Sequence, residues 1–341
     1  MERAPQFVIY ALHIPYCLYL MVRYRGLTLP TIANPGIDGS GLSNESKAEL
    51  FELMGPLGRR HLPAYVAIEA GADAMARARQ AMVEVGLSFP FIVKPDIGRR
   101  GFGVKLVHNE AELAKHLARF PAGIKLLMQR YAAGPGEVAV FYLRMPSQAH
   151  GKILALTIKH FPEMVGDGRS TLRELIVQDD RARAFAKVYF KRNREHLDDV
   201  LAPGERFRLV TVGNHVRGAA FENGSQHITP AMEKAFDTIA QEVPGFFIGR
   251  FDVRYTTLEA LKRGEEFSIV EYNGAGGEPT HIWDPRTSIA ETYAGLLEHW
   301  KYLYAVGAEN RARGERPMSL RQVISRFLAE LRLISRYPDE E

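Results

Sequence analysis

The feature that most constrains the fold is a strand that ends at Lys94-Pro95 and continues through a glycine-rich loop into a second strand. Residues 89–93 read Phe-Pro-Phe-Ile-Val, which is typical of a buried strand, and residues 104–107 predict the next strand. The loop between them, residues 96–103, reads DIGRRGFG and has three glycines in eight residues. Because no helix opens on these glycines, neither a Walker A loop nor a Rossmann fingerprint fits.

This unit has the chemistry of an anion site. Lys94 stands at the end of a buried strand, where its ammonium group can meet phosphate oxygens. Gly98, Gly101 and Gly103 allow backbone amides to approach an anion closely. A surface hairpin with a mobile glycine loop is the alternative interpretation.

Two later strands carry oxygen ligands on one face. In residues 250–254, Arg-Phe-Asp-Val-Arg, the alternation of a strand places Asp252 beside Arg250 and Arg254 on one side. The same period places Glu271 and Asn273 together. If the strands are neighbours, Asp252, Glu271 and Asn273 form a set of three oxygen ligands that suits Mg²⁺, or Mn²⁺. The alternative is that each acid forms a separate salt bridge.

Composition excludes several classes of protein. A chain of 341 residues is too long for one ordinary core and fits two or three packed lobes. Its 44 Lys and Arg residues and 40 Asp and Glu residues give a net charge of +4, with no polybasic tail, so no nucleic-acid partner is predicted. The single cysteine, Cys17, rules out an intramolecular disulfide and a cysteine-based zinc site, and a cytoplasmic location is the default.

The N-terminal region contains a mostly apolar run, FVIYALHIPYCLYLMV, at residues 7–22. It is shorter than the roughly 20 residues that span a bilayer, and His13 interrupts it. The residues before it do not form the cationic start of a signal peptide. We expect a buried strand or helix. The alternative is a membrane-surface contact through residues 7–25, helped by Arg23 and Arg25.

Two further segments have less specific patterns. Residues 181–194 are rich in cations and contain no acid, which is typical of a solvated helix face or lid edge, or of a docking surface for an anion. The chain is expected to be helical from residue 289, with a break near residues 314–317. In the last helix, residues 320–334, apolar residues recur at helical spacing and predict packing.

Local patterns predict further elements. Asn109 is expected to cap a helix, and Ser170 or Thr171 to cap another with Glu174 as the acid of a capping box. Residues 137–143 and 152–159 alternate like paired antiparallel strands, and residues 208–212 are expected to form a strand.

Four segments in this order resemble the ATP-grasp superfamily, and within it the D-alanine–D-alanine ligase type of carboxylate–amine ligase. They read FPFIVKPDIGRRGFGV, LLMQRYAAGPGEVAV, VGDGRSTLRELI, and IGRFDVRY followed by FSIVEYNGAGG. The resemblance covers residues 43–285, most of the chain. It implies an α+β, ATP-grasp fold, in which two α+β lobes grip ATP between antiparallel sheets. Here the lobes would carry a short atypical N-terminal module and a helical C-terminal tail.

The resemblance also implies a division of the chain. The expected parts are a short N-terminal module at residues 1–45, a central lobe with the glycine-rich loop at 46–128, a C-terminal lobe with the metal site at 129–300, and a helical tail at 301–341. Family members usually have a larger domain ahead of the grasp. Only 46 residues precede Lys47 here, so that domain is expected to be reduced or replaced.

The resemblance assigns roles position by position. Lys47 and Lys94 would contact phosphates, and residues 98–103 would close over them. Residues 129–132 would hold adenine and Glu137 the ribose. The nucleotide set is Lys47, Lys94, Gly98, Arg99, Arg100, Gly101, Gly103, Gln129, Arg130, Tyr131, Ala132, Glu137 and Lys159. The catalytic set is Arg250, Lys94, Gly276 and Gly277, with the two glycines as backbone-amide donors to a tetrahedral intermediate. The metal set is Asp252, Glu271 and Asn273.

The implied reaction has two steps. A carboxylate attacks the γ-phosphate of ATP to form an acyl phosphate, and an amine then attacks that acyl carbon to form an amide. ATP and Mg²⁺ are the implied cofactors, with Mn²⁺ as an alternative, and the partners are a small carboxylate and a small amine. The residues leave open an ATP-grasp kinase acting on a small hydroxylated or carboxylated metabolite, and a non-catalytic nucleotide-binding protein. They also leave open the oligomeric state, with a homodimer among the alternatives, and a membrane-associated cytoplasmic location.

The substrate-binding residues are less clearly marked than the nucleotide set. The loop at residues 29–46 is expected to replace the usual first-substrate site, with Asn34 and Ser43 as contacts. The candidates on the amine side are Glu278, Thr280, His281 and residues 214–218.

Overall fold

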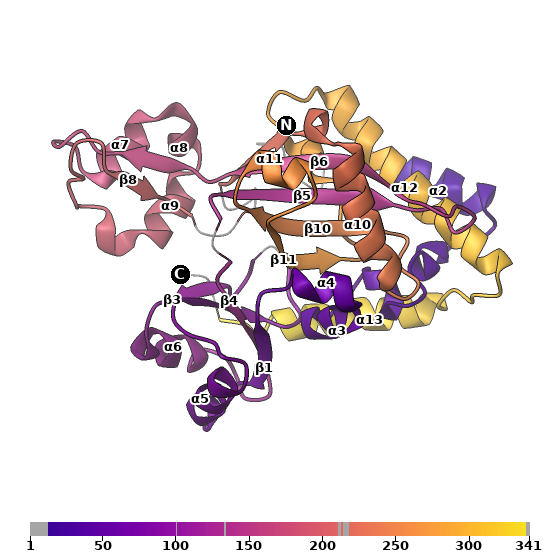
Figure 1. The fold of residues 1–341 in the computed structure, drawn as a ribbon, viewed down its shortest axis with the longest axis horizontal. Coiled ribbons are helices and arrows are strands. Elements are labelled where there is room, and N and C mark those ends of the chain that lie inside the picture. Colours follow the sequence, from indigo (N-terminus) through magenta and orange to yellow (C-terminus); the bar gives the residue numbers. More distant parts are fainter. Residues whose placement is uncertain (1–12, 100, 133, 211–212, 214–217, 339–341) are drawn as a thin grey trace.

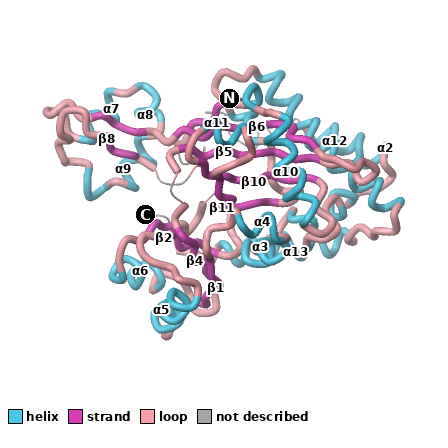
Figure 2. Tube along the Cα trace, viewed as in Figure 1, coloured by secondary structure: helices cyan, strands magenta, loops and turns pink. Residues whose placement is uncertain are grey.

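Two antiparallel sheets form the frame of the molecule (Figures 1 and 2). In this computed structural model the described residues are 13–99, 101–132, 134–210, 213 and 218–338. The smaller sheet has the strand order β1-β4-β2-β3, and the larger has β11-β10-β5-β6-β9. The strands are β1 Tyr65–Glu69, β2 Phe91–Pro95, β3 Lys105–Val107, β4 Lys125–Arg130, β5 Gly136–Leu143, β6 Lys152–His160, β9 Ala220–Asn223, β10 Ile248–Tyr255 and β11 Phe267–Asn273.

The smaller sheet packs against helices α5 (Ala74–Glu84) and α6 (Glu110–Leu117). In α5 the buried residues are Ala74, Ala78 and Ala81, whose helical spacing gives one small-residue face toward the strands. The predicted helix start at Asn109 is confirmed, because its side chain accepts the backbone N–H of Glu112. This lobe therefore presents the end of β2, with Lys94, away from its helices.

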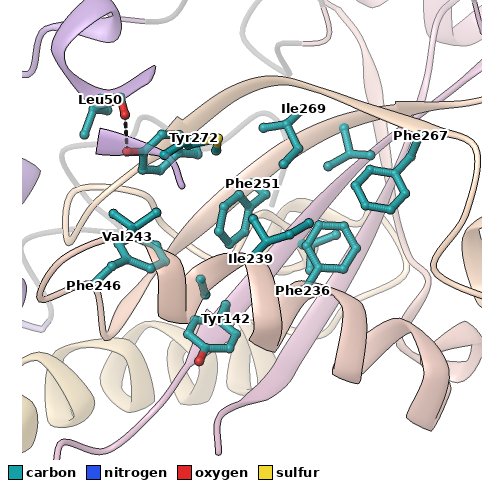
Figure 3. Packing of buried hydrophobic residues seen from close by; sticks show 14 of the residues in the cluster. Leu50, Tyr142, Phe236, Ile239, Val243, Phe246, Phe251, Phe267, Ile269 and Tyr272 are labelled. Carbon is teal, nitrogen blue, oxygen red and sulfur yellow. Dashed lines mark hydrogen bonds between the residues drawn. The ribbon is translucent and has the colours of Figure 1, made fainter. Parts of the chain in front are cut away.

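The larger sheet has an aromatic core on one face (Figure 3). Helix α10 (Pro230–Glu242) covers this face, and the rings of Phe236 and Phe267 stack with centroids 5.0 Å apart. The hydroxyl of Tyr272 donates to the carbonyl of Leu50 in helix α3 (Lys47–Leu53), as drawn in Figure 3. Because alternate residues of β10 and β11 fill this core, their polar residues are left on the opposite face.

A small unit projects from the end of β6, at the left of Figure 1. Strands β7 (Glu163–Val165) and β8 (Arg206–Arg208) pair there, beside helices α7 (Leu172–Gln178), α8 (Asp180–Ala184) and α9 (Ala186–Arg192). The predicted capping box of Thr171 and Glu174 is confirmed. A strand was expected at residues 208–212. The observed strand ends at Arg208, and residues 211–212 lie outside the described residues.

The first described helix, α2 (Ile14–Arg23), packs on the long helix α12 (Ile289–Ala312). Only one face of α2 is buried, through Cys17 and Leu20, and Ile14, Leu18 and Val22 are exposed. The expectation of a buried segment is therefore met on one face alone, and residues 7–12 lie outside the described residues. Within the described part of the chain, no helix combines the length and apolar character needed to cross a membrane.

The C-terminal helix α13 (Leu320–Ile334) differs from its prediction. Five apolar residues that were expected to pack are exposed: Leu320, Ile324, Phe327, Leu328 and Leu331. The buried residue of α13 is instead Glu330. The helix lies over polar loops, whose donors pair with a carboxylate but offer no apolar surface for the stripe to pack on. Apolar packing on the smaller lobe occurs only at the end of the helix, through Leu333 and Ile334.

Short elements complete the chain. They are α4 (Pro56–Arg60), α11 (Leu258–Lys262) and the 3₁₀ helices Leu29–Ile32, Asp38–Gly41, Arg194–His196, Ser225–His227 and Thr280–Trp283.

Candidate functional site

One cavity of about 790 Å³ lies between the two sheets. Both sheets and residues 41–45 line it. The predicted site residues that line it are Lys47, Lys94, Gly98, Arg99, Gly101, Gln129, Arg130, Tyr131, Ala132, Glu137, Lys159, Arg250, Asp252, Glu271, Asn273 and Gly276. Gly103 and Gly277 are not among the lining residues, and Arg100 lies outside the described residues.

Strands β10 and β11 bring the predicted metal ligands together. Their antiparallel register pairs Arg250 with Asn273 and Asp252 with Glu271. A β-bulge after Asp252 shifts the pairing beyond that point. Directly opposed residues of an antiparallel pair point to the same face, so all four side chains share the face that lines the cavity.

A buried chain of charges connects β5, β6 and β10. The Nζ of Lys159 lies 2.8 Å from a carboxylate oxygen of Glu137 and 2.8 Å from one of Asp252. Nη2 of Arg250 lies 3.0 Å from the other oxygen of Asp252. Burial alone would raise the pKa of Asp252, but the cations of Arg250 and Lys159 outweigh it and hold that pKa at about 2. Burial opposes the charge of Lys159 too, yet Asp252 and Glu137 raise its pKa. Asp252, Lys159 and Arg250 are therefore ionised throughout the neutral range.

The residues present fit a hard divalent cation. Asp252 and Glu271 offer carboxylate oxygens and Asn273 an amide oxygen, which are the donors that Mg²⁺ prefers. The Nδ2 atom of Asn273 is buried and has no hydrogen-bond partner among the described residues. Within the described ranges, no three His, Cys, Asp or Glu side chains gather into a metal-binding group. The candidate site thus consists of two carboxylates and one amide.

Lys94 leaves the end of β2 and crosses toward the larger sheet. Its Nζ donates to the side-chain oxygen of Gln129 at 2.8 Å and to the carbonyl of Val270 in β11 at 3.0 Å. It also lies 5.8 Å from the ring centroid of Phe51. Burial lowers the pKa of Lys94 to about 8. The ammonium group is thus charged at neutral pH but weakly compensated, so an added anion would stabilise it.

Lys47 joins the start of α3 to the glycine-rich loop. Its Nζ donates to the carbonyl oxygens of Asp96, at 3.3 Å, and Gly98, at 3.1 Å, and lies 3.7 Å from a carboxylate oxygen of Glu271. The carboxylate of Asp96 caps the same region, because it accepts the backbone N–H of Ala48 and the hydroxyl of Ser46. Lys47 is therefore at the edge of the cavity, between the loop and the candidate metal site.

The glycines of the loop have different roles. Gly101 has a φ of +71° and lines the cavity, where its backbone is accessible to a ligand. Gly103 has a φ of +67°, and a Cβ there would lie 2.9 Å from both Phe120 and Pro95. Close packing therefore accounts for the glycine at position 103, and its role in nucleotide binding stays a prediction.

The segment from Gln129 to Ala132 leads from β4 toward β5. All four residues line the cavity, as the nucleotide prediction requires. The guanidinium of Arg130 is already bonded, since Nη2 donates to the carbonyl of Gly86 at 2.9 Å. Arg254 contacts the same region, with its guanidinium carbon 4.8 Å from the ring centroid of Tyr131.

The lining residues that were not predicted as site residues include the charged side chains of Arg254 and Glu45. The period-two pattern that placed Arg254 beside Asp252 was a usable signal. Glu45 gave no such signal, because an acid just before a helix is common. Its carboxylate accepts the N–H of Gly274 at 2.7 Å, and burial raises its pKa to about 8.

The backbone amides of Gly276 and Gly277, which were predicted to bind an intermediate, are bonded within the protein. The N–H of Gly276 donates to the carbonyl of Gly41 at 3.1 Å, and that of Gly277 donates to the carbonyl of Gly274 at 2.9 Å. Their small size has another use, because a Cβ at Gly276 would lie 2.6 Å from the carbonyl oxygen of Gly41. These glycines let residues 274–277 pack closely on the N-terminal loop.

Asn34 was predicted to contact a substrate, and this is wrong. Its side chain is fully buried and bonded to the backbone at the start of β10. Nδ2 donates to the carbonyls of Ile248 and Ser40, and Oδ1 accepts the N–H groups of Phe247 and Ile248. All of its hydrogen-bonding capacity is used within the protein. Ser43, the second candidate of this loop, does line the cavity.

The candidates on the amine side are divided by the structure. Glu278 and Thr280 line the cavity, whereas His281 does not. Burial lowers the pKa of His281, which favours its neutral form. Residues 214–217 lie outside the described residues. The C-terminal helix contributes two lining residues that the sequence did not indicate, Phe327 and Glu330.

No family model matches the chain, and no curated protein matches it. Among solved structures it is similar to a bifunctional glutathione synthetase from Pasteurella multocida (16% identity, TM-score 0.37, covering 75% of this chain and 36% of that one). It is also similar to the VanG D-Ala:D-Ser ligase from Enterococcus faecalis (15% identity, TM-score 0.41, covering 79% of this chain and 64% of that one). A third similar structure is a D-alanine–D-alanine ligase from Bacillus anthracis (12% identity, TM-score 0.43, covering 85% of this chain and 72% of that one).

The chain spans about a third of that glutathione synthetase and just under two thirds of the VanG ligase. All three TM-scores are below 0.5, so the fold is assigned from the topology and not from these likenesses. The expected features are two α+β lobes with antiparallel sheets that face each other across one cavity, and all of these are present. The chain therefore has the two-lobed α+β architecture that the resemblance implied.

Proposed function

We propose that this chain is an ATP- and Mg²⁺-dependent ligase that joins a small carboxylate to a small amine through an acyl phosphate. One observation carries the proposal. Lys94, Lys159 and Arg250 lie in one cavity with the oxygen donors Asp252, Glu271 and Asn273, and opposite sheets contribute them. Cations beside carboxylates suit a polyphosphate whose charge a divalent ion shares.

The cavity has room for a nucleotide, and its lining has an apolar part and a charged part. Apolar Ile92, Val104 and Val270 line it together with residues 129–132, which suits a purine base. Glu137, next to Lys159, could accept hydrogen bonds from ribose hydroxyls. The phosphates would then extend toward the cations at the ends of β2 and β10.

We infer that Arg250 acts on the transferred phosphoryl group. Nη1 donates to the carbonyl of Glu278 and Nη2 to Asp252, which orients the guanidinium. Its Nε is buried and has no hydrogen-bond partner among the described residues. A preorganised donor of this kind stabilises charge that develops in a transition state. When bound, Mg²⁺ would neutralise phosphate charge at Asp252, Glu271 and Asn273.

The first test is nucleotide binding. Isothermal titration calorimetry with ATP and MgCl₂ would compare the wild type with Lys94→Met and Asp252→Asn. Loss of a charge-assisted contact is expected to weaken binding by about 10- to 100-fold. The matched controls are Lys234→Met and Asp198→Asn, which remove the same groups from exposed positions. The proposal fails if the wild type does not bind ATP, or if the controls weaken binding as much as the site variants.

The second test is the reaction. ADP release would be screened against amino acids and other small acids, with and without amines, and hydroxylamine would be added to trap an acyl phosphate. A hydroxamate supports the ligase. A stable phosphorylated product would instead indicate an ATP-grasp kinase. ATP binding without turnover of any acid would favour a non-catalytic nucleotide-binding protein.

A further inference from the structure

The C-terminal helix α13 places one carboxylate at the edge of the cavity. Glu330 is 3% exposed, although most neighbouring positions of its helix face solvent. Its Oε1 accepts from Nε of Arg99, and its Oε2 lies 2.6 Å from Nη2 of the same arginine. Oε2 also accepts the backbone N–H of Asn44 at 2.9 Å. A carboxylate buried this completely is stable only because these donors surround it.

The pairing fixes one edge of the Arg99 guanidinium and leaves the other available. Nε and Nη2 take both oxygens of Glu330, and Nη2 also donates to the carbonyl of Leu42 at 3.2 Å. Nη1 donates to no partner among the described residues. The Arg99 side chain is 44% exposed and lines the cavity. A bidentate arginine–carboxylate pair sets the plane of the guanidinium as well as its position.

The same helix is tied to the loops on both sides of Arg99. Nη1 of Arg326 lies 2.8 Å from Asp38, and Nη2 donates to the carbonyl of Ser43 at 3.3 Å. Beyond the helix, the hydroxyl of Tyr337 donates to the carbonyl of Ile97 at the start of the glycine-rich loop. Residues 326–337 therefore join the loop at residues 38–44 to residues 97–99 of the glycine-rich loop.

We propose that Glu330 is a positioning residue, which holds Arg99 so that the Nη1 edge of its guanidinium meets the β- and γ-phosphates of a bound nucleotide. The inference rests on the proposed function, because it assumes that the cavity binds ATP. A long side chain on a loop with three glycines would otherwise have to be ordered when the ligand binds. The pair with Glu330 orders it in advance, from a helix outside the two gripping lobes.

Calorimetry with ATP and with AMP, both with MgCl₂, would test this on the full chain. Glu330→Gln is expected to weaken ATP binding about tenfold, the order of one weakened charge-assisted contact. AMP affinity should stay at the wild-type value, because AMP lacks the phosphates that Arg99 would meet. Glu330→Asp keeps the charge and should retain most of the ATP affinity, and it also serves if the glutamine variant does not fold.

The matched control is Arg332→Gln, which changes an exposed residue of α13 without touching Arg99 or the loops and should leave ATP affinity unchanged. In an Arg99→Gln background, Glu330→Gln should have no further effect. The inference is overturned if Glu330→Gln binds ATP as the wild type does, if AMP affinity falls equally, or if Arg332→Gln weakens ATP binding as much. A wild type that binds no ATP would overturn the proposed function, and this inference with it, before any variant is compared.

Discussion

His299, in helix α12, is a buried histidine whose neutral form the fold requires. It is 4% exposed and packs edge-to-face on Phe141 with ring centroids 5.4 Å apart. Neither ring nitrogen has a hydrogen-bond partner among the described residues. Burial, helped by the nearby charge of Arg250, lowers its pKa from 6.5 to about 4. We therefore expect the histidine to make folding pH-dependent.

The direction and size of this effect on stability follow from the difference between the pKa of His299 in the unfolded chain and in the folded chain. The unfolded chain binds a proton at His299 below about pH 6.5, whereas the folded chain does not until about pH 4. Stability is fully present above pH 6.5 and is lost as the pH falls between these values. The full loss is roughly 3 kcal/mol below pH 4 and about 2 kcal/mol at pH 5, from 1.36 kcal/mol per pH unit.

The assay is urea unfolding followed by circular dichroism at pH 7 and pH 5. His299→Leu removes the ionisable group, so its loss of stability from pH 7 to pH 5 should be smaller than that of the wild type by about 2 kcal/mol. Any packing cost of leucine would lower the free energy of unfolding equally at both pH values, so it would cancel in the difference. His227→Gln, outside the core in the 3₁₀ helix Ser225–His227, should keep the wild-type difference. Equal pH dependence of wild type and His299→Leu would refute the reasoning.

Two further predictions concern the N-terminal region. Asn34→Ala should lower the free energy of unfolding by about 3 kcal/mol, because two buried N–H groups lose their acceptor, and urea unfolding measures this. Unchanged stability with impaired turnover would instead restore Asn34 as a substrate contact. We also propose that the exposed stripe Ile14, Leu18 and Val22, next to Arg23, contacts an anionic membrane surface. Co-sedimentation with phosphatidylglycerol but not phosphatidylcholine vesicles is expected, with loss in Leu18→Glu. Equal sedimentation of that variant would contradict it.

Local sequence chemistry predicted much of the framework correctly. The caps at Asn109 and Thr171 depend on residues three positions apart, so the sequence contains all the information they need. The pairing of β5 with β6 was similarly visible as two alternating segments joined by a short connection. Such elements are predictable because their partners are close in the chain.

The candidate site was predictable where its residues follow a strand period. Asp252, Glu271 and Asn273 were grouped by alternation alone, and the β10–β11 register does bring them to one face. Their chemical roles remain proposals, as do those of Lys47, Lys94 and Lys159. The strand period could not show whether the amides of Gly276 and Gly277 are available to a ligand. The carbonyl of Gly41, which accepts the N–H of Gly276, belongs to a loop that is distant in the sequence.

By itself, the sequence determined most of the elements, the glycine-rich loop and most of the charged residues that face the cavity. Only the tertiary structure decided which of those groups are already satisfied. Three of the four hydrogen bonds of the Asn34 side chain join it to residues more than 200 positions away, and Arg99 is paired with Glu330, 231 positions along the chain. The physical reason is that a polar group's availability depends on every donor and acceptor near it in space, and a local pattern reports only the neighbours in sequence.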